Sequence, residues 1–165
     1  PPPPPPPPPR FQAEDGIRDS VNGLVGSEMC IRDSSQAMGK AYFQILSFID
    51  AHDLAEAGPP MSIVRGFAGS QLRFDAAIPV RGVTDATPRD AAAVKLGYTD
   101  AGPAIRVRHV GSYRQLGSTH RKIAAYLAAL GLERNGDAWE TYISDPTRAP
   151  EAELVTDIYY PVRED

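Results

Sequence analysis

The sequence has almost no cysteine: Cys30 is the only one among 165 residues. A chain with one thiol cannot close an internal disulfide, so no disulfide framework supports the fold. The residues that follow Cys30 offer no thiolate for catalysis or metal binding. This cysteine usage suits a reducing compartment, and we expect a cytoplasmic protein.

Basic residues and long apolar runs are also scarce. The chain has 17 Lys and Arg against 21 Asp and Glu, and no basic cluster that would indicate nucleic-acid binding. No apolar run approaches the ~18 residues of a membrane span. The three histidines lack the spacing of metal ligands, and no glycine-rich phosphate loop is present. We therefore expect no metal, no cofactor, no membrane segment and no direct contact with nucleic acid.

The first 34 residues differ from the rest of the chain. Nine prolines precede FQAEDGIRDSVNGLVGSEMCIRDS, which contains IRDS twice and has no hydrophobic period. Residues 11–19 can be written TTT CAA GCA GAA GAC GGC ATA CGA GAT, which resembles the index primer of a short-read sequencing library. Residues 24–34 likewise resemble the tagmentation adapter that follows such an index. We therefore interpret residues 1–34 as non-native and expect them to be disordered.

The remaining chain contains an internal repeat. MGKAYFQILSFIDAHDLAEAGPPM aligns with LGSTHRKIAAYLAALGLERNGDAW at an offset of 78 residues. The closing segments FDAAIPV and TDIYYPV share Asp, Pro and Val after a loop four residues longer. Self-similarity of this length indicates two copies of one supersecondary unit. Matched pairs are Gly39 with Gly117, Ile45 with Ile123, Ser62 with Glu140 and Asp75 with Asp157.

Each copy predicts one amphipathic helix followed by two strands. Apolar residues recur at helical spacing in both copies, and MSIVRGF and WETYIS predict the strands after the helices. Before the second helix, AVKLGY, TDAG and PAIRVRHVGSY predict a β-hairpin. The first copy should have the same hairpin where the adapter-like segment stands. Its loss would leave an open sheet edge, so the sequence leaves a homodimer open.

The motifs RHVGSY, GLERNGDAWETYISDP and TDIYYPV, in this order around an amphipathic helix, resemble the GyrI-like domain, also called the bacterial transcription activator effector-binding domain. The resemblance covers residues 35–162: a truncated first repeat (35–80), a linker (81–95) and a second repeat (96–162). It implies an α+β fold of duplicated strand–helix–strand units. One curved antiparallel sheet is expected, with two helices on one face and a ligand cleft on the other.

The resemblance also implies a function. The family binds small molecules, often cationic or aromatic, and an acidic residue in the strand WETY is its functional signature, here Glu140. Strand alternation puts Tyr142 on the face of Glu140 and Trp139 on the other, while Asp157 and Tyr159 share a face of the last strand. A carboxylate beside aromatic rings favours a cation. The candidate ligand-binding residues are Glu140, Tyr142, Tyr159, Trp139 and Asp157.

Three functions remain open from the sequence. The first is a stand-alone sensor or sequestering protein that binds cationic or aromatic small molecules, including several drug-like ones. The second is a hydrolase of electrophilic small molecules in which Glu140 is the catalytic residue. The third is the effector-binding tail of a transcription regulator whose DNA-binding part is missing.

Overall fold

The computed structural model describes residues 23–30, 34–68, 71–91, 93–99 and 102–163. Within these residues, the helices α1 (Ser34–Ala51) and α2 (Leu116–Ala129) cover the sheet, and η2 (Tyr113–Gln115) and η3 (Glu151–Glu153) are short 3₁₀ turns. The strands are β1 (Gly23–Cys30), β2 (Ala55–Glu56), β3 (Met61–Ala68), β4 (Gln71–Arg81), β5 (Asp90–Ala91), β6 (Val94–Gly97), β7 (Ala104–Val110), β8 (Trp139–Tyr142) and β9 (Val155–Pro161).

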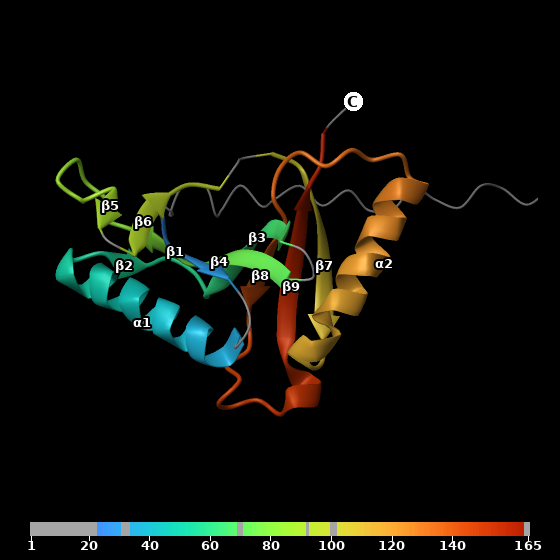
Figure 1. Ribbon diagram of the computed structural model, residues 1–165, viewed down its shortest axis with the longest axis horizontal. Coiled ribbons are helices and arrows are strands. Elements are labelled where there is room, and N and C mark those ends of the chain that lie inside the picture. Colours follow the sequence, from blue (N-terminus) through green and yellow to red (C-terminus); the bar gives the residue numbers. More distant parts are fainter. Residues whose placement is uncertain (1–22, 31–33, 69–70, 92, 100–101, 164–165) are drawn as a thin grey trace, which may run out of the picture.

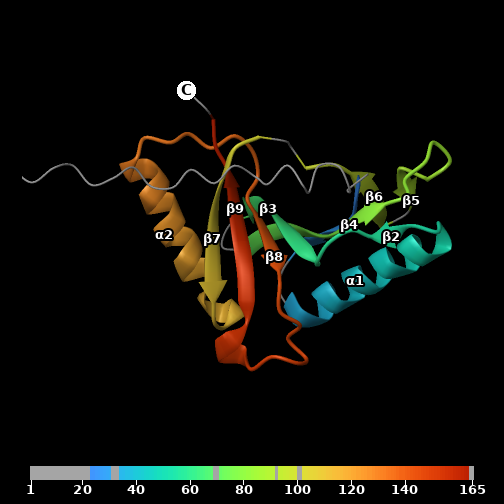
Figure 2. The same cartoon turned by 180° about the vertical axis from the view of Figure 1, so that it is seen from behind.

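The strands form one antiparallel sheet in the order β5-β6-β1-β4-β3-β8-β9-β7, and β2 pairs with β4. The middle of this order holds two units of three strands, β1-β4-β3 and β8-β9-β7, which meet where β3 pairs with β8. Each unit carries one helix, and Figures 1 and 2 show α1 and α2 at opposite ends of the sheet. The predicted α+β fold with two helices and an antiparallel sheet is confirmed.

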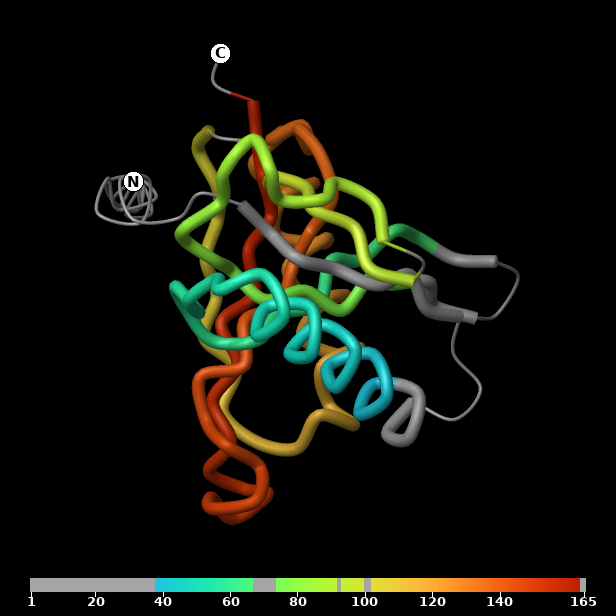
Figure 3. Tube along the Cα trace, turned by 90° about the vertical axis from the view of Figure 1, so that its left-hand side faces the viewer, coloured from blue at the N-terminus to red at the C-terminus, as the bar shows by residue number. Residues whose placement is uncertain are grey.

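Both helices cover the same face of the sheet. The strand register aligns Ala76, Ser62, Glu140 and Ile158 in one row across β4, β3, β8 and β9. Ala76 packs under α1 and Ile158 packs under α2, so the whole row faces the helices. The tube in Figure 3 shows the chain from the side, with α1 lying along the sheet.

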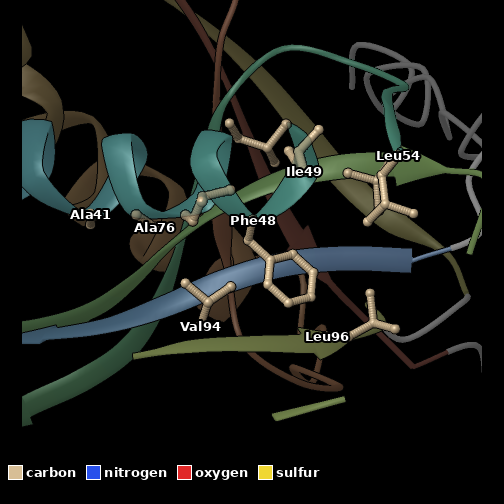
Figure 4. Close-up of a cluster of buried hydrophobic side chains, with 10 residues drawn as sticks. Ala41, Phe48, Ile49, Leu54, Ala76, Val94 and Leu96 are labelled. Carbon is tan, nitrogen blue, oxygen red and sulfur yellow. The ribbon is translucent and has the colours of Figure 1, made fainter. Parts of the chain in front are cut away.

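The helices are held by two hydrophobic clusters, one in each unit. Figure 4 shows Phe48 of α1 pointing towards Val94 and Leu96 of β6, beneath Ile49 and Leu54. The second cluster joins α2 to β9 and the segment after α2; its buried members are Leu116, Ile123, Leu127, Ala138, Ile158, Tyr160 and Val162. The apolar stripes read from the sequence therefore supply the contacts between helix and sheet.

The predicted hairpin before α2 is wrong. Its two strands exist as β6 and β7, but β6 pairs with β1 and β5, and β7 pairs with β9. Five strands separate β6 from β7 in the sheet. The pairing of β7 with β9 joins seven residues of each strand, whereas β6 has only four residues to offer. A turn signal indicates only local chain reversal, and tertiary pairing decides the partner. Each unit thus has one strand before its helix.

The segment 81–95, predicted as a linker, also contributes to the sheet. It contains β5 and the first two residues of β6, and both extend the sheet beyond β1. Val94 belongs to the cluster beneath α1, so this connection is part of the first hydrophobic core. The burial of Val94 explains why this part of the segment forms a strand. Moving an apolar side chain from solvent to a position under α1 lowers the free energy of the folded state.

Residues 23–30 belong to the segment expected to be disordered, and they form β1. This strand pairs along its whole length with β4 and, at residues 24–26, with β6. An extended backbone can satisfy the hydrogen bonds of a strand edge whatever its side chains are. The open edge expected at this place is therefore occupied, while residues 1–22 and 31–33 lie outside the described part of the chain.

Candidate functional site

Glu140 lies at the junction of the two units. In the pairing of β3 with β8, Ser62 stands directly opposite Glu140. Both side chains face the helices, and the two residues are only 3% and 7% exposed. Figure 2 shows β3 and β8 between the two helices. A carboxylate removed from water is costly unless polar groups surround it, so the partners of Glu140 define what the site can bind.

The Glu140 carboxylate has a different set of partners on each oxygen. His120 Nε2 lies 2.6 Å from Oε1. The Tyr142 hydroxyl donates to Oε2 at 2.9 Å, and Ser62 Oγ donates to the same oxygen at 3.2 Å. The Tyr142 and Ser62 hydroxyl oxygens are 3.0 Å apart. Oε2 is thus held by two residues of the sheet, whereas Oε1 is held by one residue of α2.

His120 uses both of its ring nitrogens. Nε2 contacts Glu140, and Nδ1 lies 2.7 Å from the Tyr160 hydroxyl. A neutral ring protonated at Nε2 satisfies both contacts, because the tyrosine hydroxyl then donates to Nδ1. A protonated ring also satisfies both, because the hydroxyl oxygen can accept instead. The pair of His120 and Glu140 therefore carries either no net charge or one negative charge without losing a hydrogen bond.

Four tyrosines surround this pair: Tyr42 of α1, Tyr113 of η2, Tyr142 of β8 and Tyr160 of β9. Burial raises the pKa of all four hydroxyls, and the negative charge of Glu140 raises each pKa further. At Tyr113 the charge of Asp145 adds to this effect, and at Tyr160 the nearby Arg134 opposes it. The hydroxyls remain neutral hydrogen-bonding groups around one carboxylate.

The aromatic side chains around Glu140 also contact one another. The rings of Tyr113 and Tyr142 meet edge to face with centroids 5.4 Å apart, and the rings of His120 and Tyr160 are 5.7 Å apart. Tyr42 donates its hydroxyl to the Met61 carbonyl at 2.9 Å, which fixes the α1 side of the site. A carboxylate lined by aromatic faces and neutral hydroxyls has the chemistry of a site for an organic cation.

The structure separates the sequence-predicted residues into two groups. Glu140 and Tyr142 share the helix face. Trp139, Tyr159 and Asp157 lie on the opposite face, because their positions alternate with Glu140, Ile158 and Tyr160 along the paired strands. The resemblance placed the cleft on the face away from the helices, whereas Glu140 points between the helices. These five residues therefore cannot line one site.

The opposite face has its own aromatic stack. Trp139 and Tyr159 lie parallel with centroids 5.2 Å apart. Trp139 also lines a surface pocket with Ile63, Arg65, Tyr98, Thr99, Asp137 and Pro161. Asp157 is paired with Arg108 at 2.8 and 2.9 Å and with Arg106 at 3.3 Å. The hydrogen bond from Arg108 holds the pKa of Asp157 below its usual range, as expected for a structural ion pair.

Sequence reasoning missed His120 and Tyr42 as site residues. Both carry a usable signal, since each lies on the apolar stripe of its helix. His120 precedes Ile123 by three residues and Tyr42 precedes Ile45 by three, so helical spacing already turns both towards the sheet. Which strand residue each would meet depends on the sheet order, and the sequence alone does not give that order.

The described residues contain no group of three or more His, Cys, Asp or Glu side chains that could hold a metal ion. No helix in that part of the chain is long and apolar enough to cross a membrane.

The fold and the buried polar centre together define an α+β domain of the small-molecule-binding class. The chain belongs to the GyrI-like small molecule binding domain family, whose model matches residues 33–163. No curated protein matches the sequence.

Solved structures of the same fold are distant in sequence. The C-terminal domain of EcmrR has a TM-score of 0.67 at 14% identity, over 87% of this chain and 92% of that one. A hydrolase from Listeria innocua has a TM-score of 0.64 at 14% identity, over 86% of this chain and 87% of that one. EcmrR in its complex with DNA gives a TM-score of 0.73 at 15% identity, over 87% of this chain and 54% of that one.

Proposed function

We propose that this domain binds small organic cations, with Glu140 as the counter-ion and the surrounding tyrosines as the walls of the site. The observation that carries this proposal is the buried residue Glu140, which is 7% exposed as a whole and whose carboxylate contacts an imidazole and two hydroxyls. Aromatic faces add about 0.5–2 kcal/mol of cation–π attraction. Because the carboxylate selects for positive charge and aromatic rings can stack on flat groups of different outline, such a site can accept several planar cations.

The test compares a charged probe with a neutral probe of the same shape. N-methylquinolinium carries a permanent positive charge, and 1-methylnaphthalene is its uncharged analogue. We expect saturable binding of the cation by isothermal titration calorimetry and at least about tenfold weaker binding of the analogue, since about 1.4 kcal/mol of attraction between the cation and the carboxylate corresponds to a factor of ten. Equal affinity for both probes would contradict the proposal.

Glu140→Gln removes the charge and keeps the shape of the side chain. We expect it to weaken the cation by about tenfold or more while leaving the analogue unchanged. Glu133→Gln is the matched control, because Glu133 is an exposed carboxylate paired with Arg163 at 3.2 Å, away from the site. Thermal unfolding of each variant establishes that it is folded. If both variants lost the same affinity for the cation, the effect would come from the net charge of the protein and not from Glu140.

Tryptophan fluorescence distinguishes the two faces of the sheet. Trp139 is the only tryptophan and lies on the face opposite to Glu140. Binding at Glu140 should therefore change the calorimetric signal with little change in tryptophan emission. Strong quenching that persists in Glu140→Gln would place the probe on the Trp139 face instead.

We consider two biological settings for such a site. One is the ligand-binding part of a regulator, because the C-terminal domain of EcmrR shares the fold and EcmrR was also solved in complex with DNA. The other is a stand-alone sensor in the cytoplasm. In both settings, we propose that the two matching halves arose by duplication of one ancestral unit. The presence or absence of a DNA-binding segment in the full gene separates these two settings.

Hydrolysis is the second candidate function. A hydrolase from Listeria innocua shares the fold, and Glu140 with His120 could orient a water molecule towards an electrophilic ligand. A reactive electrophile that is consumed faster than in buffer by the native chain, and not by Glu140→Gln, would support this activity. Binding without consumption would leave the binding function alone.

A further inference from the structure

We propose that His120 is the specificity-determining residue of the Glu140 site: a ligand binds by replacing the imidazole on Oε1, and cation binding is coupled to loss of the His120 proton. This inference rests on the proposed function and adds the identity of the group that a ligand must displace. It comes from the geometry around the two carboxylate oxygens, where His120 is the only hydrogen-bond partner of Oε1 among the described residues.

The two oxygens of Glu140 are held in different ways. Oε2 receives the hydroxyls of Ser62 and Tyr142, which belong to paired central strands. Oε1 receives only the imidazole, which reaches across from α2. A ligand can therefore take over Oε1 while Oε2 keeps both partners. The carboxylate stays in place and is never left without hydrogen bonds, which removes the main cost of exchange.

His120 is also the more accessible member of the pair. Its side chain is 18% exposed, against 9% for the Glu140 side chain. It lies in the early part of α2, and its other nitrogen contacts the Tyr160 hydroxyl. Rotation of the imidazole away from Oε1 would open a position lined by Tyr160 and Tyr142, beside the carboxylate. That position favours an N–H donor or a fixed positive charge, the two groups that can stand in for the imidazole.

Charge decides which ligands succeed. The groups that face the pair are the hydroxyls of Ser62, Tyr142 and Tyr160, with Tyr42 and Tyr113 farther out. Burial and the charge of Glu140 raise the pKa of these tyrosines, so they stay neutral. Arg134 lies over the Tyr160 ring, 5.1 Å from its centroid, and is always positive. No tyrosine or arginine near the pair therefore changes charge near neutral pH.

Histidine is the side chain that ordinarily titrates in this range. When His120 is protonated, its charge cancels that of Glu140 and a cation gains little. When His120 is neutral, the pair is negative and attracts the cation. Cation affinity should therefore rise with pH while the pair is losing its proton, by at most about tenfold per pH unit, and level off once the proton is lost.

The experiment measures proton release together with affinity. N-methylquinolinium, which cannot titrate, is bound to the full chain between about pH 5.5 and pH 8, in two buffers of different ionisation enthalpy. We expect the affinity to rise by up to about tenfold per unit at the acid end, with up to one proton released. In His120→Gln we expect the affinity to be independent of pH and no proton to be released.

Two other histidines serve as controls. His109 lies on β7, where its Nδ1 is 2.9 Å from Thr119 Oγ1. His52 follows α1, and its ring contacts the ring of Phe48. His52→Gln and His109→Gln should each keep the full pH dependence. Binding by the native chain that does not vary with pH would overturn this proposal and leave the proposed function standing. Proton release that persists in His120→Gln would overturn it too, and failure of the native chain to bind the cation at any pH would overturn both.

Discussion

The two halves of the sheet share a plan of packing and differ in charge. In each half, a strand precedes a helix and two strands follow, and the apolar face of the helix packs on the same side of the sheet. At the junction, however, the first half contributes Ser62 and the second contributes Glu140, at directly opposed positions. A carboxylate at both positions would bring two like charges together in a buried pair, which is strongly unfavourable. The packing of helix on sheet can therefore occur in both halves, whereas only one of the two opposed positions can carry a carboxylate.

The largest expected effect concerns the shared packing. Ile45 and Ile123 occupy matched positions in α1 and α2 and are 0% and 3% exposed. Ile45→Ala and Ile123→Ala should each lower the free energy of unfolding by about 3–4 kcal/mol, because each leaves a cavity between helix and sheet. Denaturant unfolding followed by circular dichroism measures both.

Exposed leucines provide the control for this prediction. Leu46 lies in α1 and Leu130 caps the C-terminal end of α2, and each is 43% exposed. Replacing either with alanine should change the free energy of unfolding by less than about 1 kcal/mol. If Ile45→Ala instead removed only part of the signal in a separate transition, the halves would unfold independently and the continuous sheet would not couple them.

The next effect tests the asymmetry at the junction. Ser62→Glu would place a second carboxylate against Glu140 and should destabilise the fold by about 2–3 kcal/mol at neutral pH. Repulsion raises the pKa of the introduced carboxyl in the folded state above its unfolded value. The stability is therefore recovered below the unfolded value and lost as pH rises through the folded one.

Ser62→Gln is the matched control, since it adds similar volume without charge. It should show the steric part of the effect and no such dependence on pH. If Ser62→Glu were as stable as Ser62→Gln at neutral pH, the two carboxylates would not be in contact, and the single charge at the junction would need another explanation.

The sequence alone predicted more of the fold than of the site. The helical stripes and the offset between copies predicted both helices and the strands after them, because amphipathic spacing is a local property of the chain. The hairpin before α2 failed because Gly97 of β6 pairs with Leu24 of β1, a contact that depends on the order of the whole sheet. The identity of Glu140 came from a motif resemblance, whereas its partner His120 is 20 residues away in sequence and required the fold.

The N-terminal segment illustrates the same limit. The family match begins at residue 33, the second-to-last residue of the segment 1–34 that we interpret as non-native. Yet residues 23–30 pair with β4 along their length. Backbone hydrogen bonds are common to all sequences, so pairing at an edge carries little information about the origin of a strand.

A smaller effect on stability is expected at Asp75 and Asp157, which occupy matched positions in the two copies of the repeat. Asp157 is paired with Arg106 and Arg108 and its side chain is 3% exposed, whereas Asp75 is paired with Arg65 and its side chain is 16% exposed. Asp157→Asn should cost about 1–2 kcal/mol, and Asp75→Asn should cost less. Denaturant unfolding at neutral pH compares the two variants.

The cost of Asp157→Asn should itself depend on pH. The pKa of Asp157 is lowered in the folded state by Arg108, so its stabilisation is present above the unfolded value of about 4 and is lost as pH falls through the folded value. The gap between native chain and variant should therefore narrow in acid. A constant gap down to the acid limit would show that the ion pair contributes little.

The smallest effect tests whether the helices of the two halves are equally well formed. Gly39 and Gly117 occupy matched positions, and a Cβ at either would meet no atom within 4 Å. Alanine should therefore stabilise both helices by up to about 1 kcal/mol, by reducing the freedom of the unfolded chain. Gly39→Ala should gain more, because Gly39 lies in the interior of α1 whereas Gly117 is the second residue of α2. Thermal unfolding of both variants decides the order, and no gain from Gly39→Ala would mean that α1 begins after residue 39 and that the first half is the weaker copy.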